Sequence, residues 1–234
     1  MKRIIIILFI IGVFGFITST IFAHQPRLVK EDIIEIKNPE VSQAFYAELV
    51  GTPQIYYIQS ENDFSLYVGL LVPDIPNIET DVSAIVREKD YEHESSNEHN
   101  NFEVLLDGNT HEWTPYYEEH AGDDYFTGPA LQAKDSDPTL HPKGVAVSAG
   151  EYEIEVFSSD NTGKYVLVVG EKEEFPLREI INTVLQVPQI KAYFGKSVFS
   201  AFSTPTMLGF LFTVVILAAI IIALIVFLVR KIYK

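Results

Sequence analysis

Three sets of side chains in this sequence have the chemical types that bind a metal ion or a sugar. The first set consists of the histidines His24, His111, His120 and His141. If a signal peptide is cut after Ala23, His24 becomes the first residue of the mature chain. An N-terminal histidine offers its α-amine and a ring nitrogen to one ion, and Cu(II) prefers such nitrogen-rich ligation. We expect copper binding if another histidine lies beside His24, and ordinary surface histidines otherwise.

The second set is an acidic cluster. Glu118, Asp123 and Asp124 bring carboxylates close together in the sequence, and Ca²⁺ prefers hard oxygen ligands of this kind. Their spacing matches no calcium-binding loop, so an exposed acidic loop is the simpler interpretation and a calcium site is the alternative.

The third set is aromatic. Trp113, Tyr116 and Tyr117 can stack on sugar rings at the end of a sandwich, although aromatic residues at this density more often fill a core. Neighbouring carboxylates are present, but nothing sets the separation that glycosidase chemistry requires. The sequence contains no nucleophile-elbow, phosphate-loop or dinucleotide-binding motif. We therefore predict no catalytic activity, and no cofactor beyond the copper or calcium considered above.

The elements that position these side chains include a membrane span. Met207–Val229 contains 23 residues without a charge, and about 20 apolar residues suffice for a helix to cross the hydrocarbon core. Arg230 and Lys231 follow directly, and basic residues beside a span favour the cytoplasmic side. We predict a single-pass type I membrane protein with a transmembrane helix over residues 206–229 and a short cytoplasmic tail over residues 230–234.

The N-terminus agrees with this topology. Residues 1–23 contain a short basic region, an apolar core and a smaller, more polar end, which is the pattern of a secretory signal peptide. An uncleaved signal anchor is the alternative, because residues 4–23 nearly suffice to span a bilayer. Both interpretations export residues 24–205.

The exported part is strongly acidic. It holds 12 basic and 32 acidic residues, a net charge of −20. Such a surface repels nucleic acid and anionic lipid head groups, so neither is an expected partner. The chain has no cysteine, which excludes thiolate metal sites and cysteine nucleophiles.

Strand patterns dominate residues 24–174. Gly150–Phe157 alternates apolar and acidic residues, which predicts a strand with one buried and one wet face. Lys164–Gly170 is nearly all apolar and returns after a turn, which predicts a hairpin whose second strand lies inside a sheet. Gln54–Gln59 and Phe64–Val72 flank a short polar loop, which predicts another hairpin.

Two further segments complete the prediction for the domain. Val41–Leu49 has the pattern of one or two helical turns. Phe102–Leu106 and His111–Tyr117 flank an Asp-Gly-Asn-Thr turn signal, which predicts a third hairpin. Strands at this spacing, with almost no helix between them, predict a mainly β fold: an antiparallel, jelly-roll-like β-sandwich.

The periodicity changes in the juxtamembrane segment 175–205. We predict an amphipathic helix that Pro188 breaks or kinks. Its apolar face can pack on the sandwich or lie on the membrane, and packing is favoured because only Arg178 and Lys191 supply nearby positive charge. Residues 197–205 are expected to form a short tether. The apolar residues at helical spacing are Leu177, Ile180, Ile181, Val184 and Leu185.

Gly144–Gly170 resembles the end of the bacterial pre-peptidase C-terminal domain in its Ala-Gly-Glu-Tyr and Gly-Lys-Tyr-Val-Leu-Val-Val runs. Gln54–Asp74 is similar to the paired strands of that family, which end in an apolar-Pro-Asp turn. The resemblance implies a β-sandwich that serves as an accessory or binding module, and it supplies no site residues.

Together these observations predict a non-catalytic binding module of the cell envelope, anchored in the lipid bilayer through residues 207–229. An envelope protein or a glycan is the expected partner. The alternative is an extracytoplasmic copper carrier that uses His24.

Overall fold

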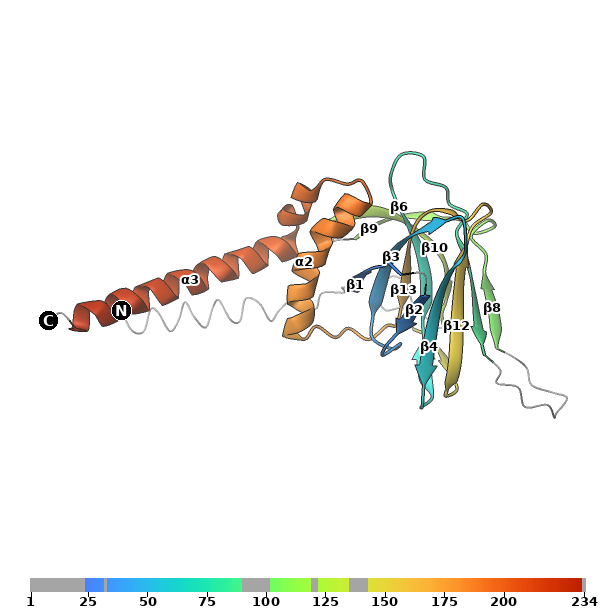
Figure 1. The fold of residues 1–234 in the computed structure, drawn as a ribbon, viewed down its shortest axis with the longest axis horizontal. Helices are drawn as coiled ribbons and strands as arrows, with labels where there is room; N and C mark the ends of the chain where they lie inside the picture. The colour runs from blue at the N-terminus through green and yellow to red at the C-terminus, as the bar shows by residue number, and fades with distance from the viewer. Residues whose placement is uncertain (1–23, 32, 90–101, 119–121, 135–142, 233–234) are drawn as a thin grey trace.

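The computed structural model describes residues 24–31, 33–89, 102–118, 122–134 and 143–232. Two β-sheets face each other, and a pair of helices follows them at one side (Figure 1). The first sheet contains, in spatial order, β1 (Gln25–Leu28), β3 (Gln43–Val50), β13 (Thr162–Val169), β6 (Val68–Pro73), β10 (Asp123–Leu131) and β9 (Thr114–Glu118). The second contains β2 (Ile33–Ile36), β4 (Gln54–Ser60), β12 (Gly150–Phe157), β7 (Ser83–Glu88) and β8 (Glu103–Leu106).

The predicted β-sandwich is confirmed. The pairs β1–β3 and β2–β4 are parallel, so each sheet is mixed, while the other strand pairs are antiparallel. A further small sheet pairs β5 (Phe64–Leu66) with β11 (Val145–Val147). The two large sheets bury a common core, in which the hydroxyls of Tyr56 and Tyr165 share a hydrogen bond of 2.9 Å.

Strand β13 is buried on both faces. Tyr165, Leu167 and Val169 point into the core between the sheets, whereas Val166 and Val168 belong to a second apolar cluster on the outer face of the first sheet. This explains the continuous apolar run, and it confirms that the strand lies inside a sheet.

The prediction of helical turns over Val41–Leu49 is wrong, because this segment forms strand β3. Phe45, Ala47 and Leu49 face the central core, while Ala44 and Tyr46 face the outer cluster. A strand that is buried on both faces lacks the polar alternation that identifies a strand in the sequence.

The three predicted hairpins are also wrong. Strand β4 pairs with β2 and β12, while β6 pairs with β10 and β13 in the opposite sheet. Strand β8 pairs with β7, and β9 pairs with β10. Strands β12 and β13 likewise belong to different sheets. A turn signal reverses the chain but does not decide whether the next strand joins the same sheet or crosses to the other one.

Helix α2 (Leu177–Tyr193) is the predicted amphipathic helix. It continues through Pro188 without ending there, because Ile190 and Phe194 are held in the apolar cluster on the outer face of the first sheet. The predicted packing of the apolar face on the sandwich is wrong for Leu177, Ile181 and Leu185, which are exposed; the end of α2 makes the contact instead, through Ile190 and Phe194.

The predicted tether contains a 3₁₀ helix, η1 (Val198–Ser203), which contacts α2. Helix α3 (Pro205–Ile232) then projects away from the sandwich (Figure 1). Its segment Met207–Lys231 is long and apolar enough to cross a membrane. Thr204 and Met207 are buried, so the first turn of α3 is docked on the domain.

Candidate functional site

A pocket of about 600 Å³ opens where β1, β2 and α2 meet. Strands β1 and β2 have four residues each and occupy edges of opposite sheets. Leu28, Val29, Ile34, Val41 and Phe45 contribute apolar wall. The charged residues that line the pocket are Arg27, Lys30, Glu31, Glu35, Lys37, Glu174 and Glu179.

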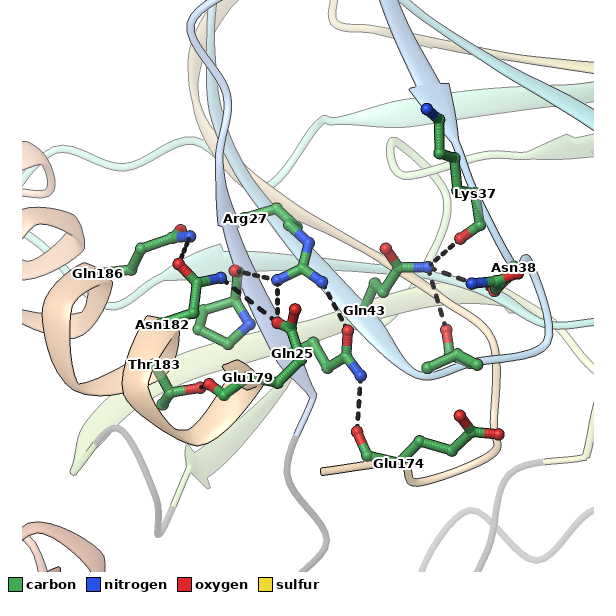
Figure 2. A network of polar contacts seen from close by, with 12 residues as sticks. Gln25, Arg27, Lys37, Asn38, Gln43, Glu174, Glu179, Asn182, Thr183 and Gln186 are labelled. Carbon is green, nitrogen blue, oxygen red and sulfur yellow. Dashed lines mark hydrogen bonds and ion pairs between the residues drawn. The ribbon is translucent and has the colours of Figure 1, made fainter. Parts of the chain in front are cut away.

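Arg27 organises one side of this pocket. Its Nη1 donates to Glu179 Oε2 at 2.8 Å, and its Nη2 donates to Gln25 Oε1 at 2.6 Å. The Gln25 amide in turn donates to the Glu174 carbonyl at 2.6 Å. Strand β1 thereby ties the start of α2 to the segment that precedes it, and the guanidinium is held in one orientation (Figure 2).

The amide of Gln43 organises the other side. Its Nε2 donates to the carbonyl oxygens of Lys37, Asn38 and Val41 at 3.0, 3.4 and 3.3 Å. Asn38 adopts a positive φ of 54° in this turn, which asparagine tolerates better than most residues. The β2–β3 turn is therefore closed by a side chain from the strand that follows it.

Helix α2 also covers the free edge of β1. The backbone N–H of Leu28 donates to Gln186 Oε1 at 3.1 Å, and Gln186 Nε2 donates to Asn182 Oδ1 at 2.9 Å. An edge strand with satisfied N–H groups is a poor template for strand addition. Ligand binding at this pocket would therefore use side chains rather than the β1 backbone.

The chemistry of the pocket suits binding. The charged residues of the pocket lining described above are three cations and four glutamates, and this lining includes no serine, cysteine or histidine. Ligand sites are commonly preformed concavities in which a few placed polar groups fix the ligand, and this lining is more highly charged than most. A nucleophile beside a general base, which covalent catalysis requires, is not part of this lining.

Of the histidines in the copper prediction, His24 and His111 lie near opposite edges of the first sheet, beside β1 and β9. His24 Nδ1 contacts Ser42 Oγ at 2.5 Å at the start of β1. The His111 ring packs edge-on against Trp113, with ring centres 6.3 Å apart. His120 and His141 lie outside the described residues, and the described residues contain no group of three or more metal-ligating side chains. Copper binding stays a prediction.

The acidic cluster lies on the β9–β10 hairpin. Asp123 is buried and pairs with Lys191 Nζ at 2.8 Å and Lys196 Nζ at 3.7 Å. Burial lowers the pKa of Lys196, and the Asp123 carboxylate opposes that effect. Glu118 is buried opposite Asp123, whereas the Asp124 side chain is exposed. Protein cations already neutralise part of this cluster, and calcium binding there stays a prediction.

The aromatic residues do not form one platform. Trp113 packs against the core and over Gly128, and its indole N–H donates to the Gly108 carbonyl at 2.8 Å. Tyr116 and Tyr117 are exposed neighbours on β9, and successive strand residues point to opposite faces. A flat sugar surface made from all three rings is therefore not assembled, and glycan binding here stays a prediction.

Sequence reasoning missed an ion-pair cluster on β12. Glu153 and Glu155 were expected on a wet face, but Glu153 is buried and receives Arg87 from β7 together with Lys89 at 3.2 Å. Arg87 also reaches Glu155 at 2.9 Å. Burial opposes ionisation of Glu153, yet Arg87 and Lys89 outweigh it and lower the pKa of this carboxyl. Arg87 and Lys89 alternate along the chain with the same two-residue spacing as Glu153 and Glu155, and this spacing was the signal available in the sequence.

No protein-family model and no curated protein matches this chain. Among solved structures, the pre-peptidase C-terminal domain of collagenase from Bacillus anthracis is similar to 62% of this chain over 98% of its own length, with 10% identity and a TM-score of 0.31. This is the domain type that Gly144–Gly170 resembles. At that similarity no residue role is transferred, so the pocket stands on the geometry of this chain alone.

Proposed function

We propose that this chain is a non-catalytic binding module of the cell envelope, held in the membrane by α3 with its β-sandwich on the extracytoplasmic side. The pocket between β1, β2 and α2 is its ligand-binding surface. The observation that carries the proposal is the direct continuation of a docked domain base into α3, an apolar helix of membrane-spanning length.

The charge distribution supports this orientation. Arg230 and Lys231 stand at the far end of α3, and basic residues beside a span are retained in the cytoplasm. The acidic domain at the other end is then exported, together with the pocket near its base.

The pocket supports a binding role because its polar groups are oriented in advance. Arg27 and Gln43 are each held by hydrogen bonds to neighbouring elements, so little side-chain freedom remains to be lost when a ligand binds. The mixed charge of the lining favours a ligand with both cationic and anionic groups, such as a segment of an envelope protein.

Cysteine labelling tests the topology. The native chain lacks cysteine, so Asn62→Cys and Lys234→Cys each create a single thiol. A membrane-impermeant maleimide added to intact cells should label position 62, and it should label position 234 only after lysis. Labelling of position 234 in intact cells would reverse the topology and overturn the proposal.

Photocrosslinking tests the pocket. A photoreactive amino acid at Lys30 in the full chain should give a discrete adduct in native membranes, whereas the same group at the exposed residue Glu61 should not. The exposed pocket residues Glu31 and Glu35 allow a charge-reversed variant, Glu31→Lys with Glu35→Lys, that should lose the adduct. Identical adducts from positions 30 and 61 would contradict a binding role for the pocket.

A further inference from the structure

Helix α2 is oriented with much of its apolar surface outward. Leu177 and Leu185 are 73% and 62% exposed, and Ile181 between them is also exposed. Residues four apart lie on one face of a helix, so these three side chains form a continuous apolar stripe. We call it, with the η1 residues described below, the basal apolar surface.

The polar flank of the same helix faces the protein. Glu179 pairs with Arg27, and Gln186 accepts from the Leu28 backbone. A helix on the surface of a water-soluble domain normally places its apolar stripe on the core and its polar residues outward. In α2, by contrast, Glu179 and Gln186 face the protein while the apolar stripe faces outward. The outer side of this helix is therefore suited to an apolar environment.

The 3₁₀ helix η1 extends this surface toward the membrane span. Phe199 is 85% exposed, and Val198 and Phe202 are exposed as well. Helix η1 contacts α2 on one side and α3 on the other. Phenylalanine side chains on the apolar face of an interfacial segment insert at the boundary between the lipid head groups and the acyl chains.

The position of α2 relative to α3 agrees with a location at the membrane surface. Figure 1 shows α2 between α3 and the sandwich, running across the direction of α3. Thr204 and Met207 are buried, and Thr204 lies against Gly122 of the β9–β10 turn. The span is thus joined to the domain through packed residues, and a helix that crosses its direction lies close to the plane of the bilayer.

The charges decide which lipid surface is suitable. Lys191 is only 1% exposed and is paired with Asp123, which leaves Arg178 as an exposed cation on α2. The exported part carries a net charge of −20, so attachment through anionic head groups is disfavoured. Insertion of apolar side chains into a zwitterionic leaflet requires no such attraction.

We propose that the basal apolar surface, formed by Leu177, Ile181, Leu185, Val198, Phe199 and Phe202, inserts into the interface of the bilayer that α3 spans. The domain then stands in one orientation on the membrane, with α2 as its base and the pocket directly above the lipid surface. This inference rests on the proposed membrane anchoring.

Depth-dependent quenching tests the proposal on the full chain. Single cysteines that replace Leu185, Phe199, Glu61 and Val215 are labelled with an environment-sensitive fluorophore, and the proteins are placed in nanodiscs of phosphatidylcholine with a nitroxide near the head group. Labels at positions 185 and 199 should show about threefold stronger quenching than the label at position 61, because they lie in the interface.

The four positions separate the possible failures. If position 215 remains within the bilayer but position 185 or 199 is quenched no more than position 61, the domain stands clear of the lipid and the inference is wrong. If position 215 is not in the bilayer, the membrane anchoring fails and the inference fails with it. The unlabelled Leu185→Cys protein tests for a dimer. A disulfide between the cysteines at position 185 of two copies would assign the basal apolar surface to a dimer interface and contradict the inference.

A matched variant adds a second readout. Leu177→Gln, Ile181→Gln and Leu185→Gln together should reduce quenching at position 199 by about half while helical content is retained, because the stripe no longer anchors the domain. Unchanged quenching at position 199 would show that α2 contributes nothing to membrane contact.

Discussion

Two buried carboxylates, Glu153 in the sandwich and Asp123 at its base, each form ion pairs with two cationic side chains, and those side chains come from different elements. Glu153 on β12 is met by Arg87 and Lys89, which belong to or follow the neighbouring strand β7. Asp123 on β10 is met by Lys191 and Lys196, which come from α2 and the segment after it. The first cluster stabilises one sheet, whereas the second attaches helix α2 to the sandwich.

The surroundings of the two clusters differ as well. Arg87 remains about one-third exposed, so solvent screens its attraction to Glu153. Lys191 is almost completely buried, and a buried ion is costly once its partner is removed. The attachment of α2 to the sandwich therefore includes a buried ion that is harder to replace than the partly exposed Arg87 of the sheet.

The largest effect is expected at Lys191. Lys191→Met should lower the free energy of unfolding by about 3 kcal/mol, because Asp123 then stays buried with only the more distant Lys196. Thermal unfolding of the full chain and hydrogen exchange of α2 measure this. Lys191→Met with Asp123→Asn should recover most of the loss, since no unpaired charge remains. If Lys191→Met costs no more stability than Lys196→Ala, the buried Lys191–Asp123 pair is not the main attachment of α2.

The β12 cluster should respond to pH. Arg87 and Lys89 hold the pKa of Glu153 below its ordinary value of 4.5. The ionised Glu153 therefore stabilises the fold at pH values above 4.5, and this stabilisation is lost as the pH falls through the lowered pKa. Glu153→Gln should therefore flatten the acid limb of the unfolding profile. Arg87→Ala should cost about 1 kcal/mol at neutral pH. An acid limb that is unchanged in Glu153→Gln would show that other carboxylates control it.

A smaller effect is expected at the start of α2. Arg27→Ala should cost about 0.5–1 kcal/mol, because the Arg27–Glu179 pair is partly exposed to solvent. Faster hydrogen exchange should be confined to the first turns of α2 and should spare Ile190 and Phe194. Uniform acceleration along α2 would mean that the helix is released as one unit and that Lys191 is not its main attachment.

The smallest effect is expected on the outer face of α2. In residues 24–205 without the apolar helix, in aqueous buffer, Ile181→Gln should change the free energy of unfolding by less than about 0.5 kcal/mol, since an exposed side chain makes few native contacts. Ile190→Ala, on the buried face, should cost about 2–4 kcal/mol. Similar losses for both variants would contradict the outward orientation of the stripe.

Local sequence patterns predicted those parts of the fold in which one segment determines its own environment. The alternation of Gly150–Phe157 placed Tyr152, Ile154 and Val156 in the core, where the structure has them. The uncharged run after Met207 predicted an apolar helix of spanning length, and α3 is that helix.

The pocket could not be predicted from those patterns. It forms because β1 and β2, separated by a few residues, join opposite sheets and because α2, about 150 residues later, covers the edge of β1. Arg27 and Glu179 carry no motif that marks them as partners. Their pairing depends on where two distant elements are brought by the rest of the fold.

The sequence by itself determined the core face of the strand Gly150–Phe157, the position of an apolar helix long enough to cross a bilayer, and the acidic, thiol-free composition of the domain. The tertiary structure alone decided the sheet each strand joins, the pairing of Asp123 with Lys191, and the face of α2 that is turned outward. The physical reason is that periodicity reports how many faces of a segment avoid water, whereas the choice of neighbour depends on the shape and charge of chain elements far away in sequence.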